Sequence, residues 1–562
     1  MSRLLLVTAA VVLLLPGLPQ AAALPASWSI APGGTPDGIA LAELDGDRGR
    51  EAAVVLRGGS YYPGAVTPGL GSLAAIDQNG ALLWQYTSTT EMVGFPAAGD
   101  LDGDGRDEIV ACENDWAAFC RALDDNGTPL FAIGPLFYPG MTNGGPALAD
   151  LNGDGLQDVI VLSFGGEIAA VAGPTGAPLW SRDLFNELGE LLFTSPVLGD
   201  LNGDGAPDLV VGGYQNGGVY AIDATSGASL WTITNLSSDP ANPAPGNAVH
   251  VVGNGAVLSD LDGDGRDEVV LPVAGSAVSA VVALDDNGTV LWWTQLVGAQ
   301  LGYTAPLAVD SDGNGSIELF VQSLDGILYR LAADGSILSQ TRTGTKSWTG
   351  PAPVDLNLDG AIDVVATNYG GLEVLDGGLS AIAHSYNEPA AGMWLAPLQA
   401  DIDNDGTIEL LTGGWLSRSI VALDLTEWAT WPWVAPGGTP QHPGSLAAGN
   451  PAQRFGSNVV QAVLVGQQLV DQFAATPGLS NGDRNTIVKD VLPELTKAVK
   501  EFGEGKPRKT VDKIKKAIEK LAKDVSANTS ALQAQLFDIQ MLAFDQLLAR
   551  TTAILGPTHP EV

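Results

Sequence analysis

The sequence predicts a mainly β fold, an eight-bladed β-propeller followed by a small α-helical bundle. Three observations lead to this prediction. An acidic nine-residue pattern recurs eight times between residues 43 and 409, a β-hairpin pattern follows most of its copies, and after residue 456 the apolar residues change to helical spacing. Self-similarity at a period of about 50 residues is typical of stacked supersecondary units rather than of unrelated domains.

Residues 1–23 have the composition of a secretory signal peptide. Arg3 precedes an apolar run from Leu4 to Leu15, and small residues follow at Ala21–Ala23. A basic start, a short apolar core and a small-residue cleavage site are the parts of such a signal, and the run is short for a membrane span. We therefore expect a mature chain that starts near Leu24 and is secreted or extracellular, or periplasmic if export stops there. A buried N-terminal strand is the alternative.

The acidic pattern reads D-x-D/N-x-D-G-x-x-D/E, and its copies start 45 to 60 residues apart. Oxygens at positions 1, 3 and 5 converge on one point when the chain turns sharply, and glycine permits that turn. A carboxylate at position 9 closes the shell from the start of the next strand. The predicted metal ligands are, copy by copy, Glu43, Asp45, Asp47 and Glu51; Asp100, Asp102, Asp104 and Glu108; Asp150, Asn152, Asp154 and Asp158; Asp200, Asn202, Asp204 and Asp208; Asp260, Asp262, Asp264 and Glu268; Asp310, Asp312, Asn314 and Glu318; Asp355, Asn357, Asp359 and Asp363; Asp401, Asp403, Asp405 and Glu409.

This oxygen-rich ligand set favours Ca²⁺, which takes six to eight oxygens in flexible geometry, over Mg²⁺, which demands an octahedron and retains waters. An EF-hand is excluded because it needs a bidentate Glu at position 12 and flanking helices. Here β-branched runs such as Val159–Val161 follow position 9 and predict buried strands. We expect up to eight bound Ca²⁺. The alternative, an Asp/Gly-rich turn without metal, is weakened by the eightfold repetition of the same ligand positions.

A second motif follows many of the acidic loops. Each copy is an apolar strand, a tight turn at Asn-Gly or Ser-Gly in most copies, and a second apolar strand, which is a β-hairpin pattern. Its copies are Ala75–Trp84, Ala122–Phe131, Ala221–Trp231, Ala283–Trp292 and a start at Ala422–Asp424. With the two strands around each acidic loop, the unit has about four strands in about 50 residues, which is a propeller blade.

The runs Gly94–Asp104, Gly145–Asp154 and Ser195–Asp204 resemble FG-GAP/VCBS repeats, the blades of integrin-α-like propellers. The resemblance covers residues 27–445 and implies Ca²⁺ held in the blade loops. Integrin-like propellers have seven blades, so the eighth copy is a departure. The hairpin motif also resembles the tryptophan-docking motif of quinoprotein propellers.

Two features bear on how a ring formed by residues 24–440 is held together. The segment Trp28–Pro36 is nearly repeated as Trp433–Pro440, so we expect the two ends to lie close together, with one or both completing the closing blade. Cys112 and Cys120 are the only cysteines. In an oxidising compartment they are expected to form a disulfide across a hairpin, and two free buried thiols are the alternative.

The C-terminal part differs in composition. Residues 441–456 are rich in Gly, Pro and Ala and are predicted to be a linker. Residues 457–562 carry apolar stripes at three- and four-residue spacing, beginning at Val488, Val511 and Leu532. Together with Val459–Phe473 they predict about four helices in a small antiparallel bundle. The bundle weakly resembles the helical modules appended to secreted bacterial hydrolases and propellers.

The charge balance excludes several partners. There are 64 acidic and 26 basic side chains, for a formal net charge of −38, and residues 24–450 hold 52 of the acidic but 11 of the basic ones. Nucleic-acid binding and docking on anionic lipid both need a basic surface. No later apolar stretch has the length of a membrane span, so we expect no membrane insertion.

Catalytic signatures are absent from the sequence: there is no G-x-S-x-G, no H-E-x-x-H and no P-loop. His250 lies in the irregular segment Asn235–Gly255 and is interpreted as a loop histidine rather than a site residue. The periodic Trp residues are interpreted as packing between blades rather than as sugar-stacking platforms. We therefore predict no catalytic or cofactor-binding residue besides the metal ligands.

The leading functional hypothesis is a secreted Ca²⁺-binding propeller that recognises, adheres to or scaffolds an extracellular protein or glycan. The second is a polysaccharide lyase or other glycan-active enzyme on an eight-bladed propeller, which the scarcity of basic residues disfavours. The third is a quinoprotein dehydrogenase. Known members of that class commonly carry adjacent cysteines beside the quinone, whereas Cys112 and Cys120 are eight residues apart.

Overall fold

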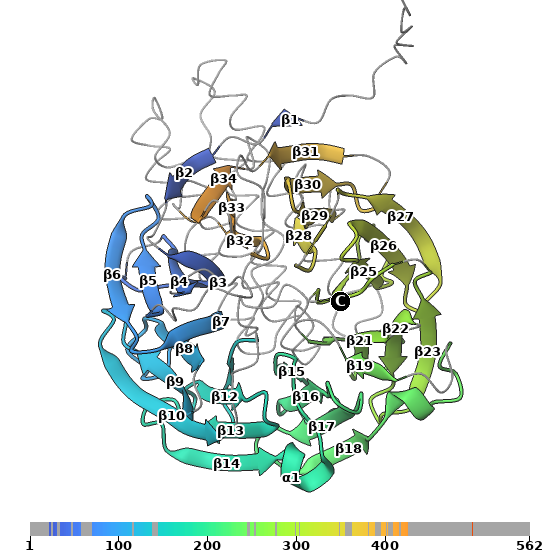
Figure 1. Ribbon diagram of the computed structural model, residues 1–562, viewed down its shortest axis with the longest axis horizontal. Coiled ribbons are helices and arrows are strands. Elements are labelled where there is room, and N and C mark those ends of the chain that lie inside the picture. The colour runs from blue at the N-terminus through green and yellow to red at the C-terminus, as the bar shows by residue number, and fades with distance from the viewer. Residues whose placement is uncertain are drawn as a thin grey trace, which may run out of the picture.

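The computed structural model describes residues 22–23, 26–30, 34–46, 49–57, 70–114, 117–137, 144–243, 248–251, 255–275, 278–297, 299–302, 304–344, 346–347, 349–354, 362–379, 382–387, 395–400, 402, 409–414, 418–424 and 497. In these residues the chain forms eight β-sheets, and the sheets are arranged as a ring with the first strand of each nearest the centre (Figure 1). The prediction of an eight-bladed propeller is therefore confirmed.

Each blade is a sheet of at least four strands, joined in antiparallel order from the centre of the ring outward. Blades 1 to 3 are β3 (Thr35–Ala42), β4 (Glu51–Arg57), β5 (Ser72–Ile76) and β6 (Leu82–Thr87); β7 (Glu91–Gly99), β8 (Glu108–Asn114), β9 (Ala117–Leu123) and β10 (Pro129–Phe137); and β11 (Ala147–Ala149), β12 (Asp158–Leu162), β13 (Glu167–Val171) and β14 (Pro178–Asp183). Blades 4 to 6 are β15 (Val197–Gly199), β16 (Asp208–Gly212), β17 (Val219–Asp223) and β18 (Ser229–Ile233); β20 (Val257–Ser259), β21 (Glu268–Gly275), β22 (Ser279–Leu284) and β23 (Val290–Gln295), with β19 (Val249–Val251) also paired to β21; and β24 (Leu307–Val309), β25 (Glu318–Gln322), β26 (Ile327–Ala332) and β27 (Ile337–Arg342).

Blade 7 is β28 (Ala352–Val354), β29 (Asp363–Asn368), β30 (Gly371–Leu375) and β31 (Ile382–Asn387), with the short β1 (Ala22–Ala23) parallel to β31. Blade 8 is β32 (Leu398–Ala400), β33 (Glu409–Gly414), β34 (Ser419–Asp424) and β2 (Ala26–Ile30). Of the predicted signal peptide, residues 1–21 lie outside the described part of the chain.

The ring is closed by the N-terminal segment. Strand β2 pairs antiparallel with β34, with Trp28 opposite Ala422, so a strand from the start of the chain is the outermost strand of the last blade. The second copy of this segment, residues 433–440, lies outside the described residues. An apolar core also joins the two ends of the ring. It combines residues of blade 1 with residues of blade 8, including Ile39, Leu41, Val54, Leu398, Leu411 and Ile420.

The strands predicted to be buried are buried. Ile109 and Val110 of β8 are fully enclosed, and the corresponding apolar pairs of β12, β16 and β21 are similarly buried. Their side chains form a near-continuous apolar run because both faces of a blade pack against neighbouring blades. Cys112 and Cys120 face each other across β8 and β9 and form a disulfide within one of these cores, as predicted.

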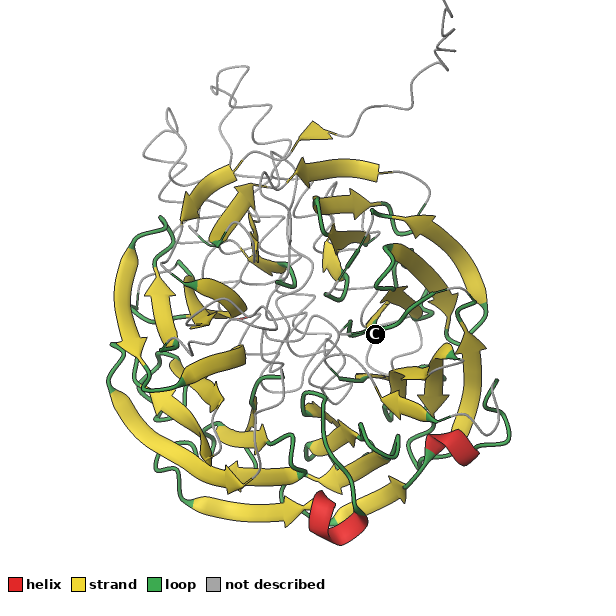
Figure 2. Ribbon diagram, in the orientation of Figure 1, coloured by secondary structure: helices red, strands yellow, loops and turns green. Residues whose placement is uncertain are grey.

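The two helices of the described residues are short parts of the propeller. They are α1 (Leu184–Leu188) and the 3-10 helix η1 (Leu236–Ser238), and both lie at the outer rim of the ring (Figure 2). No helix in the described part of the chain combines the length and apolar character needed to cross a membrane. The predicted linker 441–456 and helical bundle 457–562 lie outside the described residues, apart from Lys497.

Four tryptophans join neighbouring blades through the same contact. Trp84, Trp180, Trp231 and Trp292 lie on outermost strands, and their Nε1 atoms donate hydrogen bonds of 2.6 to 2.9 Å to the carbonyl oxygens of Asp125, Ala224, Asp286 and Ala333 in the next blade. Each indole lies against a glycine of that blade's turn, where an added Cβ would come within 2.6 to 2.8 Å of the ring. These half-buried tryptophans therefore pack between blades, in agreement with the sequence interpretation.

Substitution of one such glycine should destabilise the ring. Gly288 has φ +81°, and a Cβ there would lie 2.8 Å from the Trp231 ring. Gly288→Ala should lower the free energy of unfolding by about 3 kcal/mol, because it adds overpacking to left-handed strain. Gly189→Ala is the matched control, because φ there is +73° but no atom lies within 4 Å of the added Cβ. It should cost about 1–2 kcal/mol, from strain alone. Equal losses of unfolding free energy for the two variants, measured by denaturant unfolding, would contradict the contact between Gly288 and the Trp231 ring.

Candidate metal centres

All eight acidic loops occupy the same place in their blades. Each connects the innermost strand to the second strand, so position 9 of the pattern is the first residue of the second strand. In every blade the position-9 residue is the register partner of the residue just before position 1, as Glu51 is of Ala42 and Glu108 is of Gly99. The same holds for Asp158, Asp208, Glu268, Glu318, Asp363 and Glu409. The eight loops therefore lie at the same end of the blades and on one face of the ring.

The position-9 carboxylate holds the loop in shape from inside the blade. In seven loops it accepts a hydrogen bond of 2.5 to 2.9 Å from the backbone N–H of position 2, for example Leu101 N to Glu108 Oε2 at 2.7 Å. All eight position-9 side chains are buried. Position 2 is apolar and buried in most of these loops, as Leu101 is. The side chain of position 2 packs into the core while its N–H donates to the carboxylate of position 9, and both interactions anchor the loop.

The other predicted ligands accept backbone hydrogen bonds within the turn. Asp100 at position 1 accepts the N–H groups of Gly103 at 2.6 Å and Gly105 at 3.1 Å. Asp104 at position 5 accepts the N–H of Arg106 at 2.9 Å. Gly103 and Gly105 have φ of +84° and +91°, which explains why the pattern alternates carboxylates with glycine.

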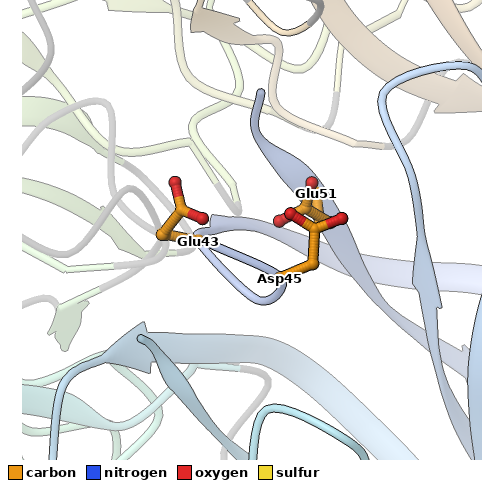
Figure 3. A group of neighbouring side chains, drawn as sticks. All are labelled: Glu43, Asp45 and Glu51. Carbon is orange, nitrogen blue, oxygen red and sulfur yellow. The ribbon is translucent and has the colours of Figure 1, made fainter. Parts of the chain in front are cut away.

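Three carboxylates converge in four of the loops, from positions 1, 3 and 9. In each group the three ligand atoms lie within 4.8 Å of one another. The groups are Glu43, Asp45 and Glu51; Asp100, Asp102 and Glu108; Asp260, Asp262 and Glu268; and Asp310, Asp312 and Glu318. Figure 3 shows the group of blade 1, in which Asp45 of the loop and Glu51 of β4 lie together and Glu43 stands beside them. In blades 2, 5 and 6, where position 5 is described, this predicted ligand is not a member of the group.

Blades 3 and 4 carry Asn at position 3 and have a different arrangement. The Asn152 Nδ2 donates to Asp158 Oδ1 at 3.3 Å, while its oxygen accepts the N–H of Asp154 at 2.8 Å. Asn202 makes the same two contacts, with Asp208 and with Asp204. In these blades an amide therefore faces the buried carboxylate. The predicted ligands Asp47, Asp355, Asn357, Asp359, Asp401, Asp403 and Asp405 lie outside the described residues.

The buried position-9 carboxylate of blade 2 is incompletely paired. Glu108 is fully buried, and its Oε1 has no hydrogen-bond partner among the described residues. Burial raises the pKa of Glu108 to about 7, and the same cause raises those of Asp208 and Glu268 to about 7. A buried carboxylate oxygen that faces two further carboxylates costs several kcal/mol unless a positive charge compensates it. The donor set, all oxygen and rich in carboxylates, fits a hard divalent cation.

The opposite face of the ring carries an aromatic cluster. It is formed by Phe164, Phe193, Tyr214 and His250, with neighbouring ring centroids 5.2 to 6.0 Å apart. His250, on β19, stacks on Tyr214, and its Nδ1 is hydrogen-bonded to the Tyr214 carbonyl oxygen. The sequence interpretation as a loop histidine is therefore wrong in placement, because His250 lies on a strand and packs against Tyr214.

Comparisons with known proteins agree with the fold. A family model described as FG-GAP-like repeat matches residues 100–161, which include the acidic loops of blades 2 and 3. A model described as outer membrane protein assembly factor BamB matches residues 215–381, from blade 4 to blade 7. No match was found among curated protein sequences.

Solved structures show similarity at low sequence identity. Sqt1 from Saccharomyces cerevisiae has a TM-score of 0.53 and 8% identity, over 73% of this chain and 100% of that chain. BamB from Moraxella catarrhalis has a TM-score of 0.45 and 15% identity over the same shares. The V. cholerae biofilm matrix protein Bap1 has a TM-score of 0.42 and 15% identity, over 77% of this chain and 98% of that chain. At these identities the likeness concerns the fold alone.

Proposed function

We propose that the chain is a secreted Ca²⁺-binding β-propeller that serves as an extracellular recognition, adhesion or scaffold module for a protein or glycan. The observation that carries the metal part is the group Asp100, Asp102 and Glu108. Its three carboxylates converge, and the fully buried Glu108 has an oxygen with no partner among the described residues. The group of blade 5 has the same residue types at the same register, and the group of blade 1 differs only in carrying Glu43 instead of Asp at position 1.

In this proposal the carboxylates at positions 1, 3 and 9 hold the ion, with position 5 as a further candidate. A bound Ca²⁺ neutralises the group and links the loop to the second strand of its blade. The role is structural, because each group lies in the turn that sets the spacing of two neighbouring strands. The other face of the ring is then free of metal loops and remains for a partner.

The proposed extracellular location is supported by two other features. Residues 1–23 have the composition of an export signal, and the blade-2 core contains the Cys112–Cys120 disulfide. Disulfides persist in oxidising compartments and are rare in the cytosol. With a net charge of −38, the partner is expected to be a neutral or basic protein or a glycan rather than nucleic acid.

The test is binding of the mature chain to glycan and protein arrays in Ca²⁺ and in EDTA. We expect selective binding in Ca²⁺ that weakens when the metal is removed. Binding to no glycan or protein in either buffer would contradict the recognition role. Turnover of an acidic polysaccharide in a parallel assay would instead favour the glycan-active enzyme.

A further inference from the structure

The carboxylate group of blade 6 is contacted by an arginine of the third strand of its own blade. The guanidinium of Arg330, on β26, lies between two of the three converging carboxylates. Its Nη2 is 3.1 Å from Asp312 Oδ2, at position 3, and 3.2 Å from Glu318 Oε1, at position 9. The side chain is 15% exposed, so this charge lies largely inside the blade. A cation is therefore already present in this group, and the protein itself supplies it.

The register shows that this arginine is a departure from the repeat. Arg330 is paired with Phe320, the residue two places after position 9. The residue at the same register in the other blades is small, and in most of them it is the alanine of the hairpin motif. These residues are Ala75, Ala122, Ala170, Ala221, Ala283, Val374 and Ala422.

A second change in the same loop completes the neutralisation of Glu318. Position 2 is Ser311 here and Leu or Ile in the other copies. Both the N–H and the Oγ of Ser311 donate to Glu318 Oε2, each at 2.8 Å. Because Arg330 occupies Oε1, both oxygens of Glu318 have partners. In blade 2 the corresponding Glu108 has a partner for Oε2 and none among the described residues for Oε1.

Two arginines in other loops do not enter the groups at positions 1, 3 and 9 among the described residues. Arg106 and Arg266, at position 7 of their loops, form ion pairs with Asp125 and Asp286 of the following hairpin turns. Their guanidinium groups therefore neutralise turn carboxylates, and the groups at positions 1, 3 and 9 of these loops keep their charge. The arrangement in blade 6 differs because its arginine comes from the third strand and reaches two of the group's own carboxylates.

We propose that Arg330 replaces Ca²⁺ in blade 6, so that this loop is held in shape without metal while the loop of blade 2 takes an ion. The inference rests on the proposed calcium binding of the other groups. A guanidinium stays protonated at all relevant pH values and donates in a planar fork that suits carboxylates. Ca²⁺ could bind the blade-6 group only by displacing this partly buried charge. The chain would then bind at most seven Ca²⁺, and blade 6 would keep its shape when the others lose their ions.

The test is a metal count on the mature chain, by elemental analysis after equilibration with Ca²⁺ and by isothermal titration. Arg330→Ala should raise the number of bound Ca²⁺ by one relative to wild type. Alanine is the residue that most other blades carry at this register, so the variant restores the repeat. Arg330→Lys keeps a positive charge and should leave the count unchanged.

Two matched variants separate this inference from the proposed function. Glu318→Gln should leave the Ca²⁺ count of the wild type unchanged, whereas Glu108→Gln should lower it by one. If Arg330→Ala adds no ion, or if Glu318→Gln removes one, the assignment of Arg330 is wrong. If the wild type binds no Ca²⁺ at all and Glu108→Gln changes nothing, calcium binding by the propeller is itself wrong.

Discussion

Removal of Ca²⁺ with EDTA should lower the melting temperature of the mature chain by on the order of 10 °C, and added Ca²⁺ should restore it. An ion bound only by the native state stabilises that state by about 2.7 kcal/mol per site at a hundredfold excess over Kd. Several groups contribute at once, because converging carboxylates recur in blades 1, 2 and 5. Without the ions the buried carboxylate at position 9 of each group is repelled by the half-buried and exposed carboxylates at positions 1 and 3.

The measurement is thermal unfolding followed by tryptophan fluorescence, since Trp84, Trp180, Trp231 and Trp292 lie at contacts between blades. Mg²⁺ is the matched control and should restore less stability than Ca²⁺, because it requires tighter octahedral geometry and keeps its waters. An unchanged melting curve in EDTA would rule out metal ions as stabilisers of the loops. Equal recovery with Mg²⁺ would show that the sites do not select for calcium.

Much of the fold could be predicted from the sequence because each repeat is one structural unit. The acidic loop marks the turn between the first two strands, and the hairpin motif marks the next turn, so eight copies predicted eight blades. Ring closure could not be predicted in the same way. The segments at 28–36 and 433–440 have nearly the same residues, and only strand pairing, with β2 on β34, shows that the first copy is used.

The candidate site was predicted less completely, because one residue that contacts it lies outside the nine-residue pattern in the sequence. The nine-residue pattern covers only the ligands within a loop. By that pattern the blade-6 copy could not be distinguished from the other copies. Arg330 is 12 residues beyond Glu318 and reaches it through the pairing of β25 with β26. The sequence carried one signal of this difference, because Arg330 and Ala332 stand where most copies of the hairpin motif have Ala and Asp. Only the register between β25 and β26 shows that this difference places Arg330 beside the carboxylates of the loop.

Glu190 had no sequence signal, because it lies in an irregular segment between α1 and β15. It is fully buried and holds the turn between β16 and β17. Its Oε1 accepts the N–H groups of Gln215 at 2.7 Å and Asn216 at 3.0 Å. Its Oε2 accepts the Tyr220 hydroxyl at 3.1 Å and the N–H of Gly218 at 3.3 Å. Burial, and then the charge of Glu190, raise the pKa of Tyr220.

Replacement of Glu190 by alanine should therefore lower the free energy of unfolding by about 4 kcal/mol. The change leaves four backbone N–H groups, those of Leu191, Gln215, Asn216 and Gly218, and one hydroxyl without their acceptor, and each buried donor left unsatisfied costs about 1–3 kcal/mol. Denaturant unfolding in the presence of Ca²⁺ measures the loss. Tyr220→Phe is the matched control, because it removes one donor and keeps the carboxylate, and it should cost about 1 kcal/mol. A loss below 1 kcal/mol for Glu190→Ala would contradict its role as the anchor of this turn.

The same variant also tests whether the two faces of the ring are stabilised independently. Glu190 acts at the end of blade 4 that is opposite to its acidic loop, since β16 runs from Asp208 of the loop to Gly212 before the turn. Glu190→Ala should therefore leave the number of bound Ca²⁺ unchanged. Mutations at sites without shared partners have additive effects on stability to within about 0.5 kcal/mol. The loss caused by Glu190→Ala should accordingly be the same with and without Ca²⁺, and a large difference would show that the metal loops and the opposite turns are coupled through the blade.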